Sequence, residues 1–302
     1  MSEVHSRGLI VTVGDLVEDI VVWPGRDILR GTDNPSRITR GRGGSAANVA
    51  AFVATEIDSR YIGRVGDDAA GRALVEQLSY AGVEVMAQRA GRTGTIVVCV
   101  SPDGERTMFP DRAAAGELAD VPPEWVDGAS ALLISAYAFA RHESATAAIA
   151  LAGRARHQHA RIAVDLASVD LITALGTGAM LDILRKLSPT VCFANRDEST
   201  LVAAEQIVGL GSIYVVKNGA DPVVIHSPHT TAVTIPVRRV EEVSDTTGAG
   251  DAFAAGFLIA LERGESIESA AAAGNAMAAR VLANPGASLE PRVPHALSQS
   301  GH

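Results

Sequence analysis

Short apolar runs and longer segments with helical periodicity alternate along most of the chain. The short runs predict buried strands at residues 9–13, 60–65, 131–135, 161–165, 190–194, 212–217 and 223–226. The periodic segments predict helices at residues 45–56, 69–81, 143–159, 178–187, 249–263 and 266–282, the first with Ser45 as its N-cap. Because strands that alternate with helices form parallel sheets covered on both faces, the pattern predicts an open α/β fold.

Two stretches interrupt this alternation. Residues 16–40 contain short β-like pieces around two prolines, and residues 95–109 contain two β-like runs around Ser-Pro-Asp-Gly, a hairpin signal. Neither stretch supplies a crossover helix, so we expect a small antiparallel sheet that covers the carboxyl ends of the parallel strands, where such folds bind ligands. The chain is predicted to be one domain, residues 1–302, with β-lid insertions at about 16–40 and 95–110.

Composition narrows the class of protein. The 302 residues are 47% hydrophobic, which allows a substantial core, and the formal net charge of −9 disfavours nucleic acid as a partner. Cys99 and Cys192 lie far apart, so neither a disulfide framework nor a cysteine zinc site is expected. The longest apolar run, residues 129–140, is too short to span a membrane. We therefore expect a cytoplasmic protein with neither a nucleic-acid nor a membrane partner.

The segment with the most chemical information is Asp-Thr-Thr-Gly-Ala-Gly-Asp-Ala-Phe, residues 245–253. Gly248, Ala249 and Gly250 leave backbone N–H groups exposed at the positive end of a helix, which is an anion site. Asp251 would repel a bound phosphate, but it is well placed to take a proton from a hydroxyl that attacks that phosphate. The alternative is a glycine-rich turn in which Asp251 only favours the helix dipole.

Two other segments carry polar groups that could face the same crevice. Glycines at residues 41–44 precede the first helix, and Asn48 in its first turn is a suitable partner for a polyol hydroxyl. Asp15 and Asp19 follow the first strand and could bind sugar hydroxyls or a metal. The alternatives are a capped glycine turn with Asn48 bonded to its own backbone, and a solvated turn that carries the two aspartates.

Together these segments resemble the ribokinase-like (PfkB) carbohydrate kinases, in order from about residue 9 to residue 288. The motifs that match are the 245–253 signature, the glycine-pair segment 43–50, Gly-x-x-Gly-x-Asp at 63–68, the lid turn at 103–106, Asn-x-x-Glu at 195–198 and Lys-Asn-Gly at 217–219. The resemblance implies a three-layer sandwich with a mostly parallel sheet and a β lid. It also implies an ATP-dependent kinase that transfers a phosphoryl group to an alcohol.

The resemblance further implies a role for each matching residue. Asp251 would be the catalytic base, with the anion site at Gly248, Ala249 and Gly250. The substrate would be held by Asp15, Asp19, Gly44, Asn48 and, at a strand end, Tyr137. Mg²⁺ would be organised by Asn195 and Glu198, and ATP would lie along Asn195, Lys217, Gly219 and Asn275. A monovalent cation such as K⁺ would bind at Asp245 and Thr247, in a site closed by Ala287 and Ser288.

The departures from the family pattern bear on the substrate. Ser45 stands where the family's phosphosugar kinases tend to carry lysine, which, with Asp15 and Asp19 nearby, favours a neutral sugar or sugar-like alcohol. Tyr137 stands where ribokinases have a substrate-contacting glutamate and could stack on a base, so a nucleoside kinase is the alternative. Arg42 or Arg112 could instead bind the carboxylate of a keto-acid sugar.

Three further expectations complete the sequence analysis. A non-catalytic sugar sensor is disfavoured because a binding protein has no need of the base Asp251. A dinucleotide-dependent oxidoreductase is disfavoured because residues 14–19 lack the glycine fingerprint. The lid hairpin is apolar on both faces, so we expect a homodimer through the lid.

Overall fold

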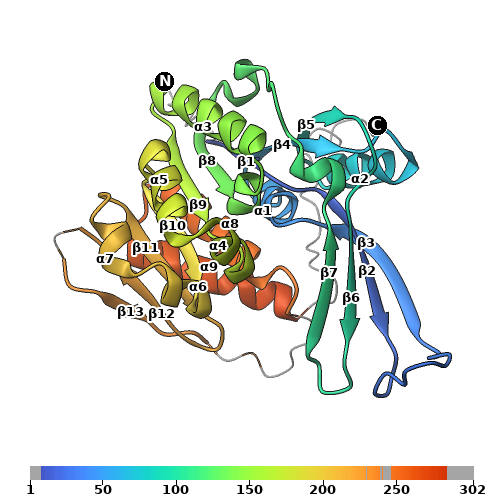
Figure 1. Cartoon of the computed structure of the whole chain (residues 1–302). Coiled ribbons are helices and arrows are strands. Elements are labelled where there is room, and N and C mark those ends of the chain that lie inside the picture. The colour runs from blue at the N-terminus through green and yellow to red at the C-terminus, as the bar shows by residue number, and fades with distance from the viewer. Residues whose placement is uncertain (1–7, 229, 239, 241–245, 284–302) are drawn as a thin grey trace, which may run out of the picture.

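The computed structural model describes residues 8–228, 230–238, 240 and 246–283. Its centre is a nine-stranded sheet in the order β13-β12-β11-β10-β9-β8-β1-β4-β5 (Figure 1). The strands from β11 to β5 run parallel. At one edge β12 is antiparallel to β11, and β13 pairs in turn antiparallel with β12. The strands are β1 (Leu9–Val13), β4 (Asp58–Val65), β5 (Glu84–Arg89), β8 (Ala129–Ser135), β9 (Arg161–Asp165), β10 (Val191–Asn195), β11 (Ile213–Asn218), β12 (Asp221–His226) and β13 (Val233–Ile235).

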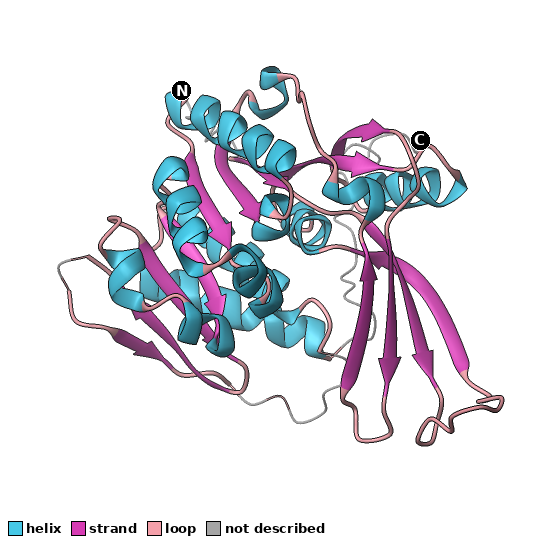
Figure 2. Cartoon of the chain, in the orientation of Figure 1, coloured by secondary structure: helices cyan, strands magenta, loops and turns pink. Residues whose placement is uncertain are grey.

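Both faces of this sheet are covered by helices, which explains why its central strands are apolar runs rather than alternating ones. On one face, side chains such as Val11 and Leu132 pack against α3 (His142–His157) and α5 (Thr177–Leu187). On the other face, Ile10 and Phe193 pack against α1 (Ser45–Ala54), α8 (Ala249–Glu262) and α9 (Ile267–Leu282). The remaining described α-helices are α2 (Ala69–Tyr80), α4 (Val169–Leu175), α6 (Arg196–Leu201) and α7 (Ala204–Val208). The predicted α/β class is confirmed (Figure 2).

A second, four-stranded sheet extends from one end of the main body, as Figures 1 and 2 show. Its strands are β2 (Val17–Trp23), β3 (Arg37–Gly43), β6 (Thr95–Val100) and β7 (Arg106–Asp111), in the order β3-β2-β6-β7. The outer pairs are antiparallel, and the central β2–β6 pair is parallel because the two strand pairs come from separate insertions. The two stretches that interrupt the α/β alternation therefore do build one small sheet.

Local differences from the sequence prediction have simple causes. The predicted N-cap Ser45 is wrong: Gly44 caps α1 with a φ of 103°, and Ser45 is the first residue of the helix. The hydroxyl of Ser45 is instead hydrogen-bonded to a residue more than 200 positions away. The short elements β5, β13, α4, α6 and α7 were not predicted, because each is too short or too exposed to show a clear period. Within the described residues, no helix is both long and apolar enough to cross a membrane.

Candidate active site

A cavity of about 1430 Å³ lies between the small sheet and the carboxyl ends of the parallel strands. Sites in open α/β sheets are expected at this edge. All of the predicted site residues that the structure describes line this cavity: Asp15, Asp19, Gly44, Asn48, Tyr137, Asn195, Glu198, Lys217, Gly219, Thr247, Gly248, Ala249, Gly250, Asp251 and Asn275. The predicted residues Asp245, Ala287 and Ser288 lie outside the described residues.

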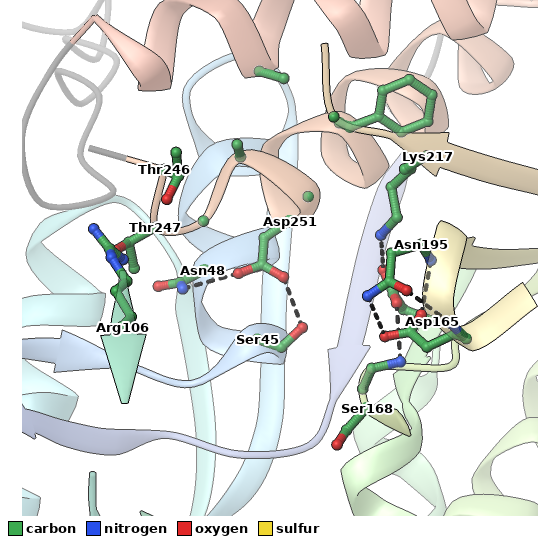
Figure 3. A pocket seen from close by; sticks show the side chains of 18 of the residues that line it. Ser45, Asn48, Arg106, Asp165, Ser168, Asn195, Lys217, Thr246, Thr247 and Asp251 are labelled. Carbon is green, nitrogen blue, oxygen red and sulfur yellow. Dashed lines mark hydrogen bonds and ion pairs between the residues drawn. The ribbon is translucent and has the colours of Figure 1, made fainter. Parts of the chain in front are cut away.

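Asp251 lies in the first turn of α8, beside the N-terminus of α1 (Figure 3). Its carboxylate accepts a hydrogen bond of 2.7 Å from Oγ of Ser45 and one of 3.0 Å from Nδ2 of Asn48. Burial raises the pKa of Asp251 to about 7, and the charge of Asp165 adds to this, while the bonds from Asn48 and Ser45 oppose it. A carboxylate with such a pKa can accept a proton at neutral pH.

The N-terminus of α8 presents positive charge beside Asp251. Gly248 caps the helix with a φ of 74°, a conformation that glycine adopts without strain. By helix geometry the first amides, including those of Gly250 and Asp251, lack partners within the helix. A Cβ atom at position 250 would lie only 3.4 Å from Nζ of Lys217, so the ammonium group lies against this turn. The helix end and Lys217 together favour an anion here.

Three neighbouring parallel strands end beside this anion site. Asp165 ends β9, Asn195 ends β10 and Lys217 lies near the end of β11, and the register pairs Asn195 with Lys217. Nζ of Lys217 forms a 2.7 Å ion pair with Oδ2 of Asp165. Burial alone would lower the pKa of Lys217, but the charges of Asp165 and Glu198 raise it above its usual value. Lys217 is therefore a cation beside the anion site of the cavity.

Asn195 and Glu198 form a reciprocal capping box at the start of α6. Both oxygens of the Glu198 carboxylate accept hydrogen bonds of 2.8 Å from Asn195, one from the backbone and one from the side chain. The carboxyl group is buried, and burial together with the charge of Asp165 raises its pKa to about 7. Among the described residues, His, Cys, Asp and Glu side chains form no group of three or more that could bind a metal alone. A divalent cation here would need further ligands, such as water and phosphate oxygens.

The opposite end of the cavity contains the buried carboxylate of Asp15 and the half-buried carboxylate of Asp19. Asp15 accepts a hydrogen bond from Arg112, and its other oxygen, like Oδ1 of Asp19, is buried without a hydrogen-bond partner among the described residues. Burial, with the nearby charge of Asp15, raises the pKa of Asp19 to about 6. Buried acceptors are costly unless a donor reaches them. Ligand hydroxyl groups would supply those donors.

The sequence analysis missed several polar residues of this cavity. Asp165 was not singled out, although it ends a predicted strand at the edge where Asn195 and Lys217 also lie. Arg106 donates to the hydroxyl of Thr247. Arg112, considered earlier only as a carboxylate ligand, lies with its guanidinium carbon 3.4 Å from the ring centroid of Tyr137. That contact covers one face of the ring, so only the other could stack on a substrate.

Asn275 and Gly219, which the resemblance assigns to the nucleotide, also line the cavity. Asn275 lies on α9, and its Nδ2 donates a 3.3 Å hydrogen bond to the carbonyl oxygen of Pro236. Gly219 follows β11 with a φ of 62°. The roles of both residues toward a nucleotide stay predictions.

Comparison with known proteins places these features in a family. Residues 8–294 match the model of the pfkB family carbohydrate kinases. An ATP-dependent ribose-1-phosphate kinase of Halopiger xanaduensis is 33% identical over 82% of this chain and 83% of its own length. A fructokinase of Klebsiella pneumoniae is 31% identical over 84% of this chain and 85% of its own length.

The fold agrees with that match. The crystal structure of an adenosine kinase from Sinorhizobium meliloti superposes with a TM-score of 0.81 at 24% identity, covering 95% of this chain and 96% of the other. At that identity the likeness concerns the fold alone. The family match, the extent of the similarity to named kinases and the geometry of the cavity agree, and the chain belongs to the pfkB family of carbohydrate kinases, phosphotransferases with an alcohol group as acceptor.

Proposed function

We propose that this protein transfers the γ-phosphate of ATP to a hydroxymethyl group of a neutral sugar or sugar-like alcohol, with Asp251 as the base. The observation that carries the proposal is the position of Asp251. It lies in the first turn of α8, at the anion site, and lines the same cavity as Asp15 and Asp19, each of which has a buried oxygen with no hydrogen-bond partner among the described residues. An acceptor held by those oxygens would direct a hydroxyl group toward both the base and a phosphoryl group.

The residues of the cavity divide the chemistry between them. Asp251 accepts the proton of the attacking hydroxyl, while the amides at the start of α8, among them that of Gly250, stabilise the negative charge that develops on the transferring phosphoryl group. Lys217 adds a positive charge beside the same turn. The small sheet lines one side of the cavity, and its apolar side chains would limit the access of water to a bound acceptor.

The residues fit Mg²⁺ bound together with ATP. Glu198 and Asp165 are two buried carboxylates near one cation, Lys217, and a divalent cation would balance the excess negative charge. Mg²⁺ would supply neutralisation of the phosphates, held through Glu198 and its waters. A K⁺ site at Asp245 and Thr247 is also part of the proposal. The hydroxyl of Thr247, which lines the cavity, accepts a hydrogen bond from Arg106.

Charge at the acceptor end supports a neutral substrate. Arg112 is paired with Asp15, and Arg42 and Arg106 donate to Asn48 and Thr247, so each arginine already has a protein partner. A second phosphate on the acceptor would lie near Asp15 and Asp19. One relative is named for ribose 1-phosphate, which makes that phosphosugar the most informative competitor in an assay.

A nucleoside is the alternative acceptor. The small sheet turns apolar side chains toward the cavity, among them Val21, Ile96, Val98 and Met108. Such a surface could cover the flat face of a base. A curated relative, at 27% identity, is named adenosine kinase 1 of Arabidopsis thaliana.

The deciding experiment measures ADP release with ATP and Mg²⁺ across a panel of acceptors. The panel contains neutral pentoses and hexoses, a keto-acid sugar, adenosine, pseudouridine, ribose 1-phosphate and fructose 6-phosphate, with Asp251→Asn as the blank. We expect the highest kcat/KM for a neutral sugar, with the phosphate on its hydroxymethyl oxygen by NMR of the product. A higher value for a phosphosugar would contradict the neutral acceptor, a higher value for a nucleoside would select the alternative, and binding without turnover would indicate a sensor.

We also propose a homodimer through the small sheet. The face of this sheet that points away from the cavity carries half-buried apolar residues, such as Ile20 and Val97, and the exposed residues Ile38 and Phe109. Covering these side chains in a symmetric pair would remove apolar surface from water.

A further inference from the structure

We propose that Arg42 is a positioning residue for the reaction: it holds the side-chain amide of Asn48 in the one orientation that presents a donor to Asp251. The inference rests on the proposed function only in taking Asp251 as the base. It concerns a residue of the small sheet that the sequence analysis considered only as a ligand for a carboxylate.

The contacts form a chain through three elements. Nη1 of Arg42, near the end of β3, donates a 3.0 Å hydrogen bond to Oδ1 of Asn48 on α1. Nδ2 of Asn48 in turn donates a 3.0 Å hydrogen bond to Oδ2 of Asp251 on α8, and Figure 3 shows this bond as a dashed line. Asn48 is only 5% exposed, so water does not substitute easily for either partner. The small sheet is thereby joined to the proposed base by two hydrogen bonds.

The chemistry of the two partners explains why an arginine is suited to this position. An amide can be turned over with little change of shape, and the turned Asn48 would direct its carbonyl oxygen at Asp251. A protonated Asp251 could donate to that oxygen, so the turned amide would favour the protonated form, which is inactive as a base. Arg42 has donors and no acceptor, and it therefore excludes the turned amide.

Other charged groups around Asp251 set the background for this effect. Asp165 from β9 raises the pKa of Asp251 and Lys217 from β11 lowers it, while Ser45 on α1 donates to its second oxygen. Burial lowers the pKa of Arg42 to about 10, and the charges of Asp251 and Asp19 oppose that fall. Arg42 is therefore close enough to both carboxylates to interact with their charges. Both the charge of Arg42 and its hydrogen bond to Asn48 therefore favour ionised Asp251.

The test compares Arg42→Met, which removes the charge and the donor, with Arg42→Lys, which keeps both. Arg40→Met is the matched control, because Arg40 lies on the same strand, pairs with Glu18 instead and has a side chain that is 66% exposed. The titration of Asp251 is followed without turnover, by the ¹³C shift of labelled aspartate carboxyl groups. The signal is assigned by its loss in Asp251→Asn, which also separates it from Asp19, whose pKa is raised as well.

We expect Arg42→Met to raise the titration midpoint of Asp251 by about half to one pH unit. Arg42→Lys should restore most of the shift, and Arg40→Met should leave the midpoint unchanged. With the acceptor that proves best in the panel, kcat of Arg42→Met should fall by about 3- to 10-fold at acid pH and recover at alkaline pH, with KM for ATP unchanged. A merely structural role would instead lower kcat by the same factor at every pH.

An unchanged Asp251 midpoint in Arg42→Met would overturn the inference, as would a rise confined to KM for the acceptor. A raised midpoint in a protein that phosphorylates no member of the panel would leave the positioning role of Arg42 standing. In that case the proposed function would be the part that failed.

Discussion

At the scale of single residues, the chemistry depends on how opposing influences balance at Asp251. Burial and the charge of Asp165 raise its pKa, the bonds from Asn48 and Ser45 lower it, and the result is about 7. Glu198 reaches a similar pKa of about 7 through burial and the same aspartate. The charge of Asp165, a residue that the sequence analysis did not single out, thus raises the pKa of both carboxyl groups.

Asp251→Asn should lower turnover by about 10²- to 10⁴-fold, because the amide cannot accept the hydroxyl proton. The substitution keeps the shape of the side chain, so the Kd for ATP, measured by calorimetry, should stay close to the wild-type value. Near-normal turnover in this variant would show that Asp251 is not the base.

Turnover should also depend on pH through Asp251. The carboxylate is active when it is ionised, and its pKa is raised to about 7, so kcat should fall as pH drops below about 7 and level off above it. The measurement is kcat at saturating substrates across the neutral range. An acid limb near pH 4, the range of an unperturbed carboxyl group, would contradict the raised pKa.

Glu198→Gln should raise the Mg²⁺ concentration that gives half-maximal activity, because a neutral amide attracts the cation and its waters less strongly. Asp197→Asn is the control, since Asp197 is the exposed neighbour on the same helix. A Mg²⁺ titration that is the same for both variants would leave Glu198 only a capping role for α6.

At the scale of elements, the start of α1 shows how backbone geometry places side chains. Gly44 turns the chain from β3 into the helix with a φ of 103°, and a Cβ atom there would lie 2.4 Å from the carbonyl oxygen of Asp15. The same turn brings Ser45 and Asn48 to Asp251. A non-glycine residue would need to move either α1 or the Asp15 turn.

Gly44→Ala should therefore lower the free energy of unfolding by at least about 1 kcal/mol and reduce kcat. Gly153→Ala is the matched control. Gly153 lies within α3 with nothing within 4 Å of an added Cβ atom, so alanine there should be neutral or stabilise by up to about 1 kcal/mol. Urea unfolding and the standard assay measure both effects. Equal stability of the two variants would show that the turn tolerates a side chain.

At the scale of the whole molecule, the small sheet has two different faces. Alternate residues of a strand share a face, and Ile96 and Val98 line the cavity. Val97 therefore lies on the opposite face, together with its cross-strand partner Phe109. Phe109 is 57% exposed and Ile38 is 59% exposed. An exposed apolar group of this kind is typical of an interface.

We expect light scattering to give a dimer at micromolar concentration, and Phe109→Asp to shift it toward the monomer. Tyr80→Asp serves as the control, since Tyr80 is 85% exposed on α2, which lies outside the small sheet. A wild-type monomer at that concentration would contradict dimerisation through this face.

The sequence by itself determined the α/β class, the second sheet, the family and the motif residues that line the cavity. These follow from local patterns: apolar periods define strands and helices, and motifs such as residues 245–253 carry glycines and an acid at fixed spacing. Since most of these motifs begin helices or end parallel strands, the site residues predicted from them that the structure describes line one cavity.

Only the tertiary structure decided which groups from distant segments meet. Ser45 and Asp251 are 206 residues apart, and Asp165 and Lys217 are 52 apart, yet each pair is within hydrogen-bonding distance. Strand order and the turn at Gly44 bring these pairs together, and neither leaves a local period in the sequence. The pKa of Asp251 and the role proposed for Arg42 depend on burial and such contacts, because charge interactions act through space rather than along the chain.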